Sequence, residues 1–254
     1  MICDIKAIDV HRHWTYGHPL EPAQGSSKND VDSIKEMADM ANIEAVFVSP
    51  YVAVIGDNRD EAIIESNERL AELVKEKDFL YQFVVIEPRV EETFLQARRM
   101  LESKKCVGIK LHPSFNKYNL EDYAKKIFDF AATYNTVIQI HPQGFATHIV
   151  PWADKYPQLN FIQAHLSEHG QIEAIKQAKY GNVWTDTSSS SSMSNQLIEY
   201  AYSQIGADRI MFGTDTNHAG AFRGRIEYAL IPDEVKYKIL RGTAEKLFAK
   251  YLNK

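Results

Sequence analysis

The chain has 254 residues, of which 44% are hydrophobic, and it carries a formal net charge of −5 with a pI near 6.0. A chain of this length can bury one large core, so we expect residues 1–254 to form a single domain. Lys and Arg are scattered along a mildly acidic sequence, which argues against nucleic-acid binding.

Membrane insertion and export are not expected either. No uninterrupted apolar stretch approaches the ~18 residues that a membrane helix needs. The first residues enter a β-rich segment without the basic region and the long apolar region of a signal peptide. Cys3 and Cys106 form no close metal or redox pair and are interpreted as small apolar residues. Together these features predict a cytoplasmic protein.

Eight β-rich segments follow one another along the chain, with room for one helix between consecutive segments. Stretches such as AVFVS and YQFVVI are almost continuously apolar, which is typical of parallel strands covered by helices. The repeat predicts an α/β protein with a (β/α)8 TIM barrel, although a doubly wound open sheet would alternate in the same way. The segments span residues 5–11, 43–50, 79–87, 106–112, 136–141, 159–166, 182–187 and 209–215.

The connecting segments have the apolar spacing of amphipathic helices. Ser33 and Glu36 fit a capping box near the start of the first helix. A long charged helix is expected over residues 60–77, and a final helix is expected over residues 233–252.

Histidine and aspartate recur at the ends of separate apolar segments. His11 and His13 in IDVHRH are two residues apart, so on a strand they point to the same side. IQIHP, FIQAHL and MFGTD place His141, His165 and Asp215 at three further strand ends. One such histidine is usually a packed core residue, but several at matching positions predict the ligands of one metal ion. Because these strands can converge only if the sheet closes, the same residues favour the barrel over the open sheet.

Imidazole and carboxylate ligands suit zinc or a similar divalent ion with an open position for water. The two cysteines are too few for a thiolate-rich structural zinc site. A catalytic ion lowers the pKa of a bound water from ~15.7 to about 7 and polarises a substrate oxygen. We therefore expect one divalent metal ion, with zinc as the first choice. Asp215 would both bind it and hold the water or move its proton.

Taken in order, seven motifs resemble those of the amidohydrolase superfamily. They are IDVHRHW, GIKLHP, IQIHPQG, FIQAHLSEHG, NVWTDTS, MFGTDTNH and ILRGTAEKLF, and they extend from the first strand to the last helix. The resemblance is to the amidohydrolase-related branch that includes aminocarboxymuconate semialdehyde decarboxylase. It implies a (β/α)8 barrel with one divalent metal ion, commonly zinc, held by His11, His13, His141 and Asp215. It further implies that His165 acts as acid or base on the metal-bound water, although binuclear relatives use that histidine as a ligand.

Three other residues are candidates for substrate contact. Lys110 either pairs with a neighbouring carboxylate or binds an anionic substrate. In some binuclear relatives a lysine at this strand is carboxylated and bridges two metals, but we expect a single ion. His112 either faces the barrel mouth and touches substrate or has a structural role. Arg223 follows Asp215 closely enough to line the pocket and to bind a substrate carboxylate.

Some polar residues near the strand ends keep two interpretations. Asp9, Glu87 and Asp186 could each orient a histidine or lie at a solvent-facing turn. The serine tract at residues 188–192 follows a strand and could supply hydroxyls at the mouth, but we interpret it as a loop of modest functional weight.

The ligand set favours a metal-dependent hydrolase acting on a small polar molecule with an amide, ester or lactone bond. The runner-up is a nonoxidative decarboxylase of a carboxylated substrate, since the same branch contains carbon–carbon lyases. An arginine near the metal, for which Arg223 is the obvious candidate, would favour decarboxylation. A noncatalytic barrel that binds metal or ligand is the alternative of a different class. Homo-oligomerisation is compatible with each of these functions.

Overall fold

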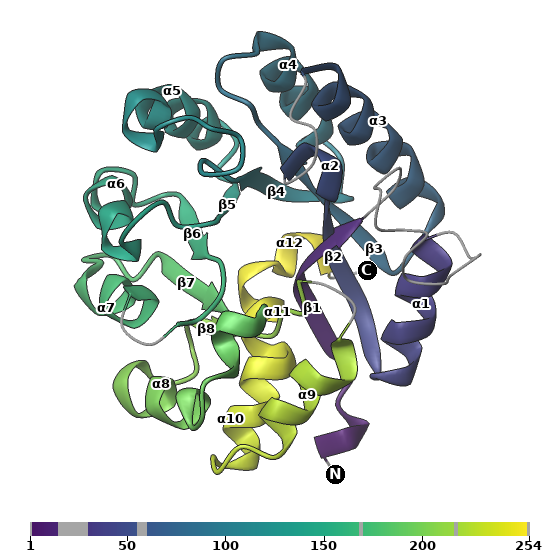
Figure 1. Ribbon diagram of the computed structural model, residues 1–254, viewed down its shortest axis with the longest axis vertical. Coiled ribbons are helices and arrows are strands. Elements are labelled where there is room, and N and C mark those ends of the chain that lie inside the picture. The colour runs from purple at the N-terminus through teal and green to yellow at the C-terminus, as the bar shows by residue number, and fades with distance from the viewer. Residues whose placement is uncertain (1, 15–29, 55–59, 168–169, 216–217, 253–254) are drawn as a thin grey trace.

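The computed structural model describes residues 2–14, 30–54, 60–167, 170–215 and 218–252. Its centre is a sheet of eight parallel strands that pair in sequence order, with most helices in a ring outside it (Figure 1). The strands are β1 (Ala7–Trp14), β2 (Ile43–Pro50), β3 (Leu80–Val85), β4 (Cys106–Leu111), β5 (Val137–Ile140), β6 (Asn160–Gln163), β7 (Val183–Asp186) and β8 (Ile210–Met211).

The sheet closes on itself between its first and last strands. The backbone N–H of Val10 donates to the carbonyl of Phe212 at 3.0 Å, and that of Asp215 donates to the carbonyl of His11 at 2.6 Å. Arg12 and Asp215 form a parallel bridge at the same seam. In an open sheet the first and last strands would not bond to each other. The structure therefore confirms the predicted (β/α)8 barrel and excludes the doubly wound alternative.

The connecting helices pack their apolar faces onto the outside of the barrel, where burial of apolar surface stabilises the fold by about 25 cal/mol per Å². None of the helices in the described residues is both long and apolar enough to span a membrane. The helices are α1 (Asp30–Met40), α2 (Tyr51–Val54), α3 (Asp60–Glu76), α4 (Glu91–Met100), α5 (Leu120–Ala132), α6 (Val150–Lys155), α7 (Gly170–Gln177), α8 (Leu197–Ile205), α9 (Ala219–Glu227), α10 (Asp233–Tyr237), α11 (Thr243–Leu247) and α12 (Ala249–Leu252).

Two helix predictions differ from the structure. Helix α1 already begins at Asp30, so Ser33 lies inside it and the predicted capping box is wrong. The expected final helix over residues 233–252 is interrupted by a π-helical turn at Lys238–Gly242. At this turn the carbonyl of Ile239 accepts the backbone N–H of Phe212, which follows β8, at 2.8 Å. A helix that gives up a carbonyl to the barrel cannot keep its regular hydrogen-bond ladder there.

The C-terminal segment closes the amino end of the barrel. Phe248 packs edge-on against Phe47 and Phe83, with ring centroids 4.8 and 6.2 Å away, and all three are fully buried. Arg241 from the same segment donates to the carbonyl of Lys6, just before β1, at 2.6 Å. With this end filled by side chains, the carboxyl ends of the strands form the mouth where ligands bind in such barrels.

Candidate metal centre

The barrel brings the sequence-predicted histidines and Asp215 to one end. His11 and His13 lie on β1, and His112 and His141 directly follow β4 and β5. His165 follows β6, and Asp215 follows β8. Because all eight strands are parallel, their carboxyl ends surround a single mouth, and residues far apart in the chain meet there.

His11, His13 and Asp215 form a compact group whose potential ligand atoms all lie within 4.8 Å of one another. Asp215 Oδ1 is 3.2 Å from His13 Nε2 and 3.7 Å from His11 Nε2. Asp215 has a φ of +64°, a strained conformation for a residue other than glycine. Hydrogen bonds across the barrel seam hold it there, including the one from its own N–H to the His11 carbonyl. Two buried imidazoles and one carboxylate are a donor set that fits a divalent ion.

The other ring nitrogen of each histidine in this group is held by a residue of another strand, Ser49 on β2 and Asp186 at the end of β7. His13 Nδ1 lies 3.0 Å from Ser49 Oγ, and His11 Nδ1 lies 3.0 Å from Asp186 Oδ2. Both Nε2 atoms are therefore directed toward Asp215. A carboxylate behind a metal-binding imidazole fixes the orientation of the ring and increases its basicity. Asp186, whose role was ambiguous from the sequence, contacts His11.

The electrostatics of the group favour the protonation states that bind metal. Burial lowers the pKa of His13 to about 4, so its ring is neutral at physiological pH. Burial alone would raise the pKa of Asp215, but its hydrogen bond to His13 and the nearby imidazoles lower it well below the usual value. A neutral imidazole and an ionised carboxylate are the forms that coordinate a cation.

Lys110 places an amino group inside the same cluster. Its Nζ is 2.8 Å from His11 Nε2 and donates to Gln139 Oε1 at 3.2 Å. The side chain is almost completely buried, and burial lowers its pKa to about 8 against the opposing charges of Asp186 and Asp215. The amino group therefore lies against a candidate metal-ligand atom of the group formed by His11, His13 and Asp215.

His141 and His112 stand together beside the three-residue group. Their rings are stacked, with centroids 4.1 Å apart, and the His141 ring also meets the edge of His165 at 5.0 Å. His141 Nδ1 lies 3.2 Å from the carbonyl of Pro142. His141 is not part of the cluster whose ligand atoms lie within 4.8 Å. Burial lowers the pKa of His141 to about 4 and also lowers that of His112, so both rings are neutral imidazoles.

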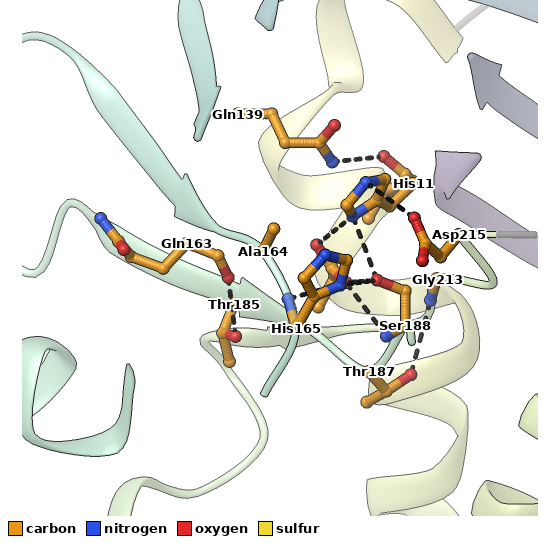
Figure 2. Close-up of polar contacts among 12 residues, drawn as sticks. His11, Gln139, Gln163, Ala164, His165, Thr185, Thr187, Ser188, Gly213 and Asp215 are labelled. Atoms are coloured by element: carbon orange, nitrogen blue, oxygen red, sulfur yellow. Dashed lines mark hydrogen bonds and ion pairs between the residues drawn. The ribbon is translucent and has the colours of Figure 1, made fainter. Parts of the chain in front are cut away.

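His165 stacks on His11 and is tied to Ser188, the first residue of the serine tract interpreted from the sequence as a loop of modest functional weight. The two rings have centroids 4.9 Å apart, and His165 Nδ1 lies 2.9 Å from Ser188 Oγ (Figure 2). His165, His11 and Asp186 form a second group of potential metal ligands. Ser188 Oγ hydrogen-bonds to all three, so this group is already joined through a hydroxyl. Asp186 ends β7 and Ser188 follows it by two residues, a spacing that puts both side chains on the same side of an extended chain.

Two charged residues with candidate roles at the site make their contacts elsewhere. Arg223 points to the amino end of the barrel, where it donates to the carbonyls of Ile5 and Asn42 at 2.9 and 3.1 Å. Its placement does not support a role in binding substrate. Glu87 is buried and does not face solvent, and its carboxylate pairs with Arg89 through both oxygens, at 2.6 and 2.8 Å.

Asp9 braces the barrel seam beneath the site. Its carboxylate accepts the backbone N–H groups of His11 and Thr214, both at 3.1 Å, and the Thr214 hydroxyl at 2.6 Å. Burial raises the pKa of Asp9 to about 6. Its contacts are with the backbone that carries His11, so it supports the site from below and does not line it.

The chain resembles known proteins both in its sequence and in its fold. The family model described as amidohydrolase matches residues 8–250. No curated protein matches the sequence significantly.

Several solved structures share the fold over nearly the whole chain. The 5-carboxyvanillate decarboxylase of Sphingomonas paucimobilis has a TM-score of 0.75 at 14% identity, covering 96% of this chain and 99% of that one. A putative amidohydrolase from Staphylococcus aureus has a TM-score of 0.71 at 16% identity, with coverage of 96% and 99%. A dihydroxybenzoic acid decarboxylase from Polaromonas sp. JS666, solved with manganese and 2-nitroresorcinol, has a TM-score of 0.68 at 18% identity, with coverage of 98% and 99%.

Proposed function

The chain belongs to the amidohydrolase family, and on that premise we propose that it is a metal-dependent, nonoxidative decarboxylase of a small aromatic carboxylate. The observation that carries this proposal is the buried Lys110 amino group, 2.8 Å from His11 Nε2 at the edge of the His11, His13 and Asp215 group. A carboxylate drawn to this cluster meets a fixed cationic group in a site of low dielectric constant, where such a pair is strong. Similarity to decarboxylases of 5-carboxyvanillate and dihydroxybenzoic acid supports the same chemistry.

The metal would be held by His11, His13 and Asp215, with His141 as a proposed fourth ligand. A bound divalent ion supplies positive charge that orients the oxygen atoms of a substrate and stabilises negative charge developing on it. The manganese in the Polaromonas structure makes manganese as good a candidate as zinc. The lone pair of His11 Nε2 can serve either a metal ion or an N–H of Lys110. A metal ion bound to this nitrogen would therefore leave the Lys110 amino group available for a substrate carboxylate.

In the proposed decarboxylation, Lys110, His112 and His165 have different roles. Lys110 binds the carboxylate, and His112 lines the mouth beside His141. The carbon–carbon bond to the carboxylate breaks, its electron pair stays on the substrate carbon, and carbon dioxide leaves. His165 adds a proton, taken from solvent, to that carbon. Burial lowers the pKa of His165 to about 3, so the ring is neutral at rest and carries the proton only while it passes from solvent to the carbon.

Hydrolysis of an amide, ester or lactone is the second candidate. It was the first interpretation of the sequence, and the description of the matching family favours it. Asp215 and His165, which both face His11, are also the residue types that move protons to and from water. The two candidates share the metal site and differ in the bond that breaks.

The decisive experiment measures carbon dioxide. The protein is stripped of metal, reloaded with Mn²⁺ or Zn²⁺, and incubated with 2,6-dihydroxybenzoate or 5-carboxyvanillate as probes. We expect metal-dependent release of carbon dioxide. In His13→Ala and Asp215→Asn we expect both the bound metal and the release of carbon dioxide to be lost. Lys110→Met should keep its metal and lose at least about 10-fold in kcat/KM, which corresponds to ~1.4 kcal/mol. The exposed Lys104→Met is the matched control. Hydrolysis of an amide, ester or lactone panel without any release of carbon dioxide would establish the second candidate instead.

A further inference from the structure

The hydroxyl of Ser188 lies at the junction of three site residues. Its Oγ is 2.9 Å from His165 Nδ1 and 3.1 Å from His11 Nδ1, and it hydrogen-bonds to Asp186 Oδ1. Figure 2 shows dashed contacts from both imidazole rings to this hydroxyl, with His11 coming from β1 and His165 from the segment after β6. Ser188 is fully buried, so water does not compete for these contacts.

Counting donors and acceptors determines where the protons lie. A serine hydroxyl has one hydrogen to donate and two lone pairs to accept, whereas an ionised carboxylate can only accept. The Ser188 hydrogen must therefore point to Asp186 Oδ1. Both imidazole contacts then use the lone pairs of the serine, so the hydrogen at His165 has to be on Nδ1. This leaves Nε2 of His165 without a hydrogen while the ring is neutral.

The surrounding backbone holds this arrangement in place. The N–H of Ser188 donates to Asp186 Oδ1 at 3.0 Å, and the carbonyl of Ser188 accepts the Ser192 hydroxyl at 2.6 Å. The carbonyl of His165, a residue with a φ of +64°, accepts Gln171 Nε2 at 2.8 Å. A left-handed conformation at a histidine is costly and persists only where surrounding contacts impose it. Both partners of the hydrogen bond are thus fixed before any ligand binds.

We propose that Ser188 is a positioning residue that selects the Nδ1–H tautomer of His165 and so makes Nε2 the nitrogen that exchanges a proton with the substrate. The consequence for catalysis rests on the proposed role of His165 in proton transfer. The tautomer itself does not depend on which reaction the site carries out. Asp186 completes the arrangement because it takes the hydrogen of Ser188 and also holds His11.

The test is the tautomer of His165, observed by long-range ¹H–¹⁵N NMR of protein labelled with ¹⁵N-histidine. The protein is loaded with Zn²⁺, which is diamagnetic, and measured at mildly alkaline pH where the ring is neutral. The signal among the nine histidines is identified by its loss in His165→Gln. We expect a protonated Nδ1 and a bare Nε2 in the wild-type protein. If His165 of the wild-type protein carries its hydrogen on Nε2, the proposal is overturned by this measurement alone, and no variant of Ser188 is needed.

Variants then separate positioning from folding. Ser188→Ala should give a mixture of tautomers at His165, and Ser188→Thr, which keeps the hydroxyl, should restore the Nδ1–H form. Ser49→Ala is the matched control, because it removes the hydroxyl 3.0 Å from His13 Nδ1 and should leave the His165 signal unchanged. A pure Nδ1–H tautomer in folded Ser188→Ala would refute the proposal.

Activity provides a separate readout that identifies which idea has failed. If carbon dioxide release is observed, Ser188→Ala should lower its kcat about 10- to 100-fold, the range seen when the partner of a site histidine is removed, with little change in KM. An unchanged kcat would overturn the catalytic part of the proposal. If no carbon dioxide is released by the wild-type protein, the proposed function fails while the NMR result still decides the tautomer.

Discussion

Replacing Arg223 by Met separates a structural role from a substrate-binding role. The guanidinium donates from Nη2 to the carbonyls of Ile2 and Ile5 at 3.2 and 2.9 Å, and from Nη1 to the carbonyl of Asn42 at 3.1 Å. Its Nε donates to Glu227 Oε1 at 2.7 Å, and the side chain is only 6% exposed. Methionine keeps most of the apolar stem but donates no hydrogen bond. The substitution therefore detaches the N-terminal turn from α9.

The loss of stability can be estimated from these contacts. A hydrogen bond from a charged donor contributes ~1.5–3 kcal/mol when buried, but the carbonyls here are partly buried and water can replace some of their partners. A net loss of ~2–4 kcal/mol is therefore expected for Arg223→Met. In a chain of this size each kcal/mol lowers the midpoint of thermal unfolding by about 2–4 °C, so the total shift is roughly 4–16 °C.

The assay is unfolding by urea and by heat, followed by circular dichroism, together with measurement of bound metal. Arg98→Met on α4 is the matched control, because Arg98 is exposed, and its stability should stay within ~0.5 kcal/mol of the wild type. Both variants should bind metal normally. An Arg223→Met protein with unchanged stability and a raised KM would refute the structural role and restore the substrate contact expected from the sequence.

Two further predictions concern packing and burial. Gly108→Ala should lower the free energy of unfolding by about 1–3 kcal/mol, because its Cβ would lie 2.4 Å from the Val137 carbonyl oxygen. Gly220→Ala should raise the free energy of unfolding by about 0.5–1 kcal/mol, because its Cβ meets nothing outside its own helix within 4 Å. Urea unfolding measures both changes, and changes of the same sign in the two variants would contradict this reasoning. Cys106 is 1% exposed and burial raises its pKa to about 12, so native protein should react with DTNB only at exposed Cys3 and unfolded protein at both. Rapid reaction of two thiols in the native protein would disprove the burial of Cys106.

The order of the elements, and the end of the barrel at which the candidate site lies, follow from the amino-acid sequence alone. Continuous apolar runs identify parallel strands because such strands are buried on both faces, and this property is local. The two-residue spacing of His11 and His13 places both on one side of β1, because successive side chains of a strand point to opposite faces. His141, His165 and Asp215 were located because each ends an apolar run, and the parallel strands bring those ends together.

Which polar groups meet depends on how the barrel is assembled and cannot be read from the sequence. His11 contacts Asp186 and Ser188, which are 175 and 177 residues away along the chain. No local pattern encodes these pairs. Arg223 looked close to the site in sequence, yet it lies at the opposite end of the barrel because α9 runs back along the outside. The periodicity of apolar residues indicates which face of an element is buried. It does not indicate the partner of a buried hydrogen-bond donor, because that donor bonds to whichever acceptor the closed barrel brings next to it.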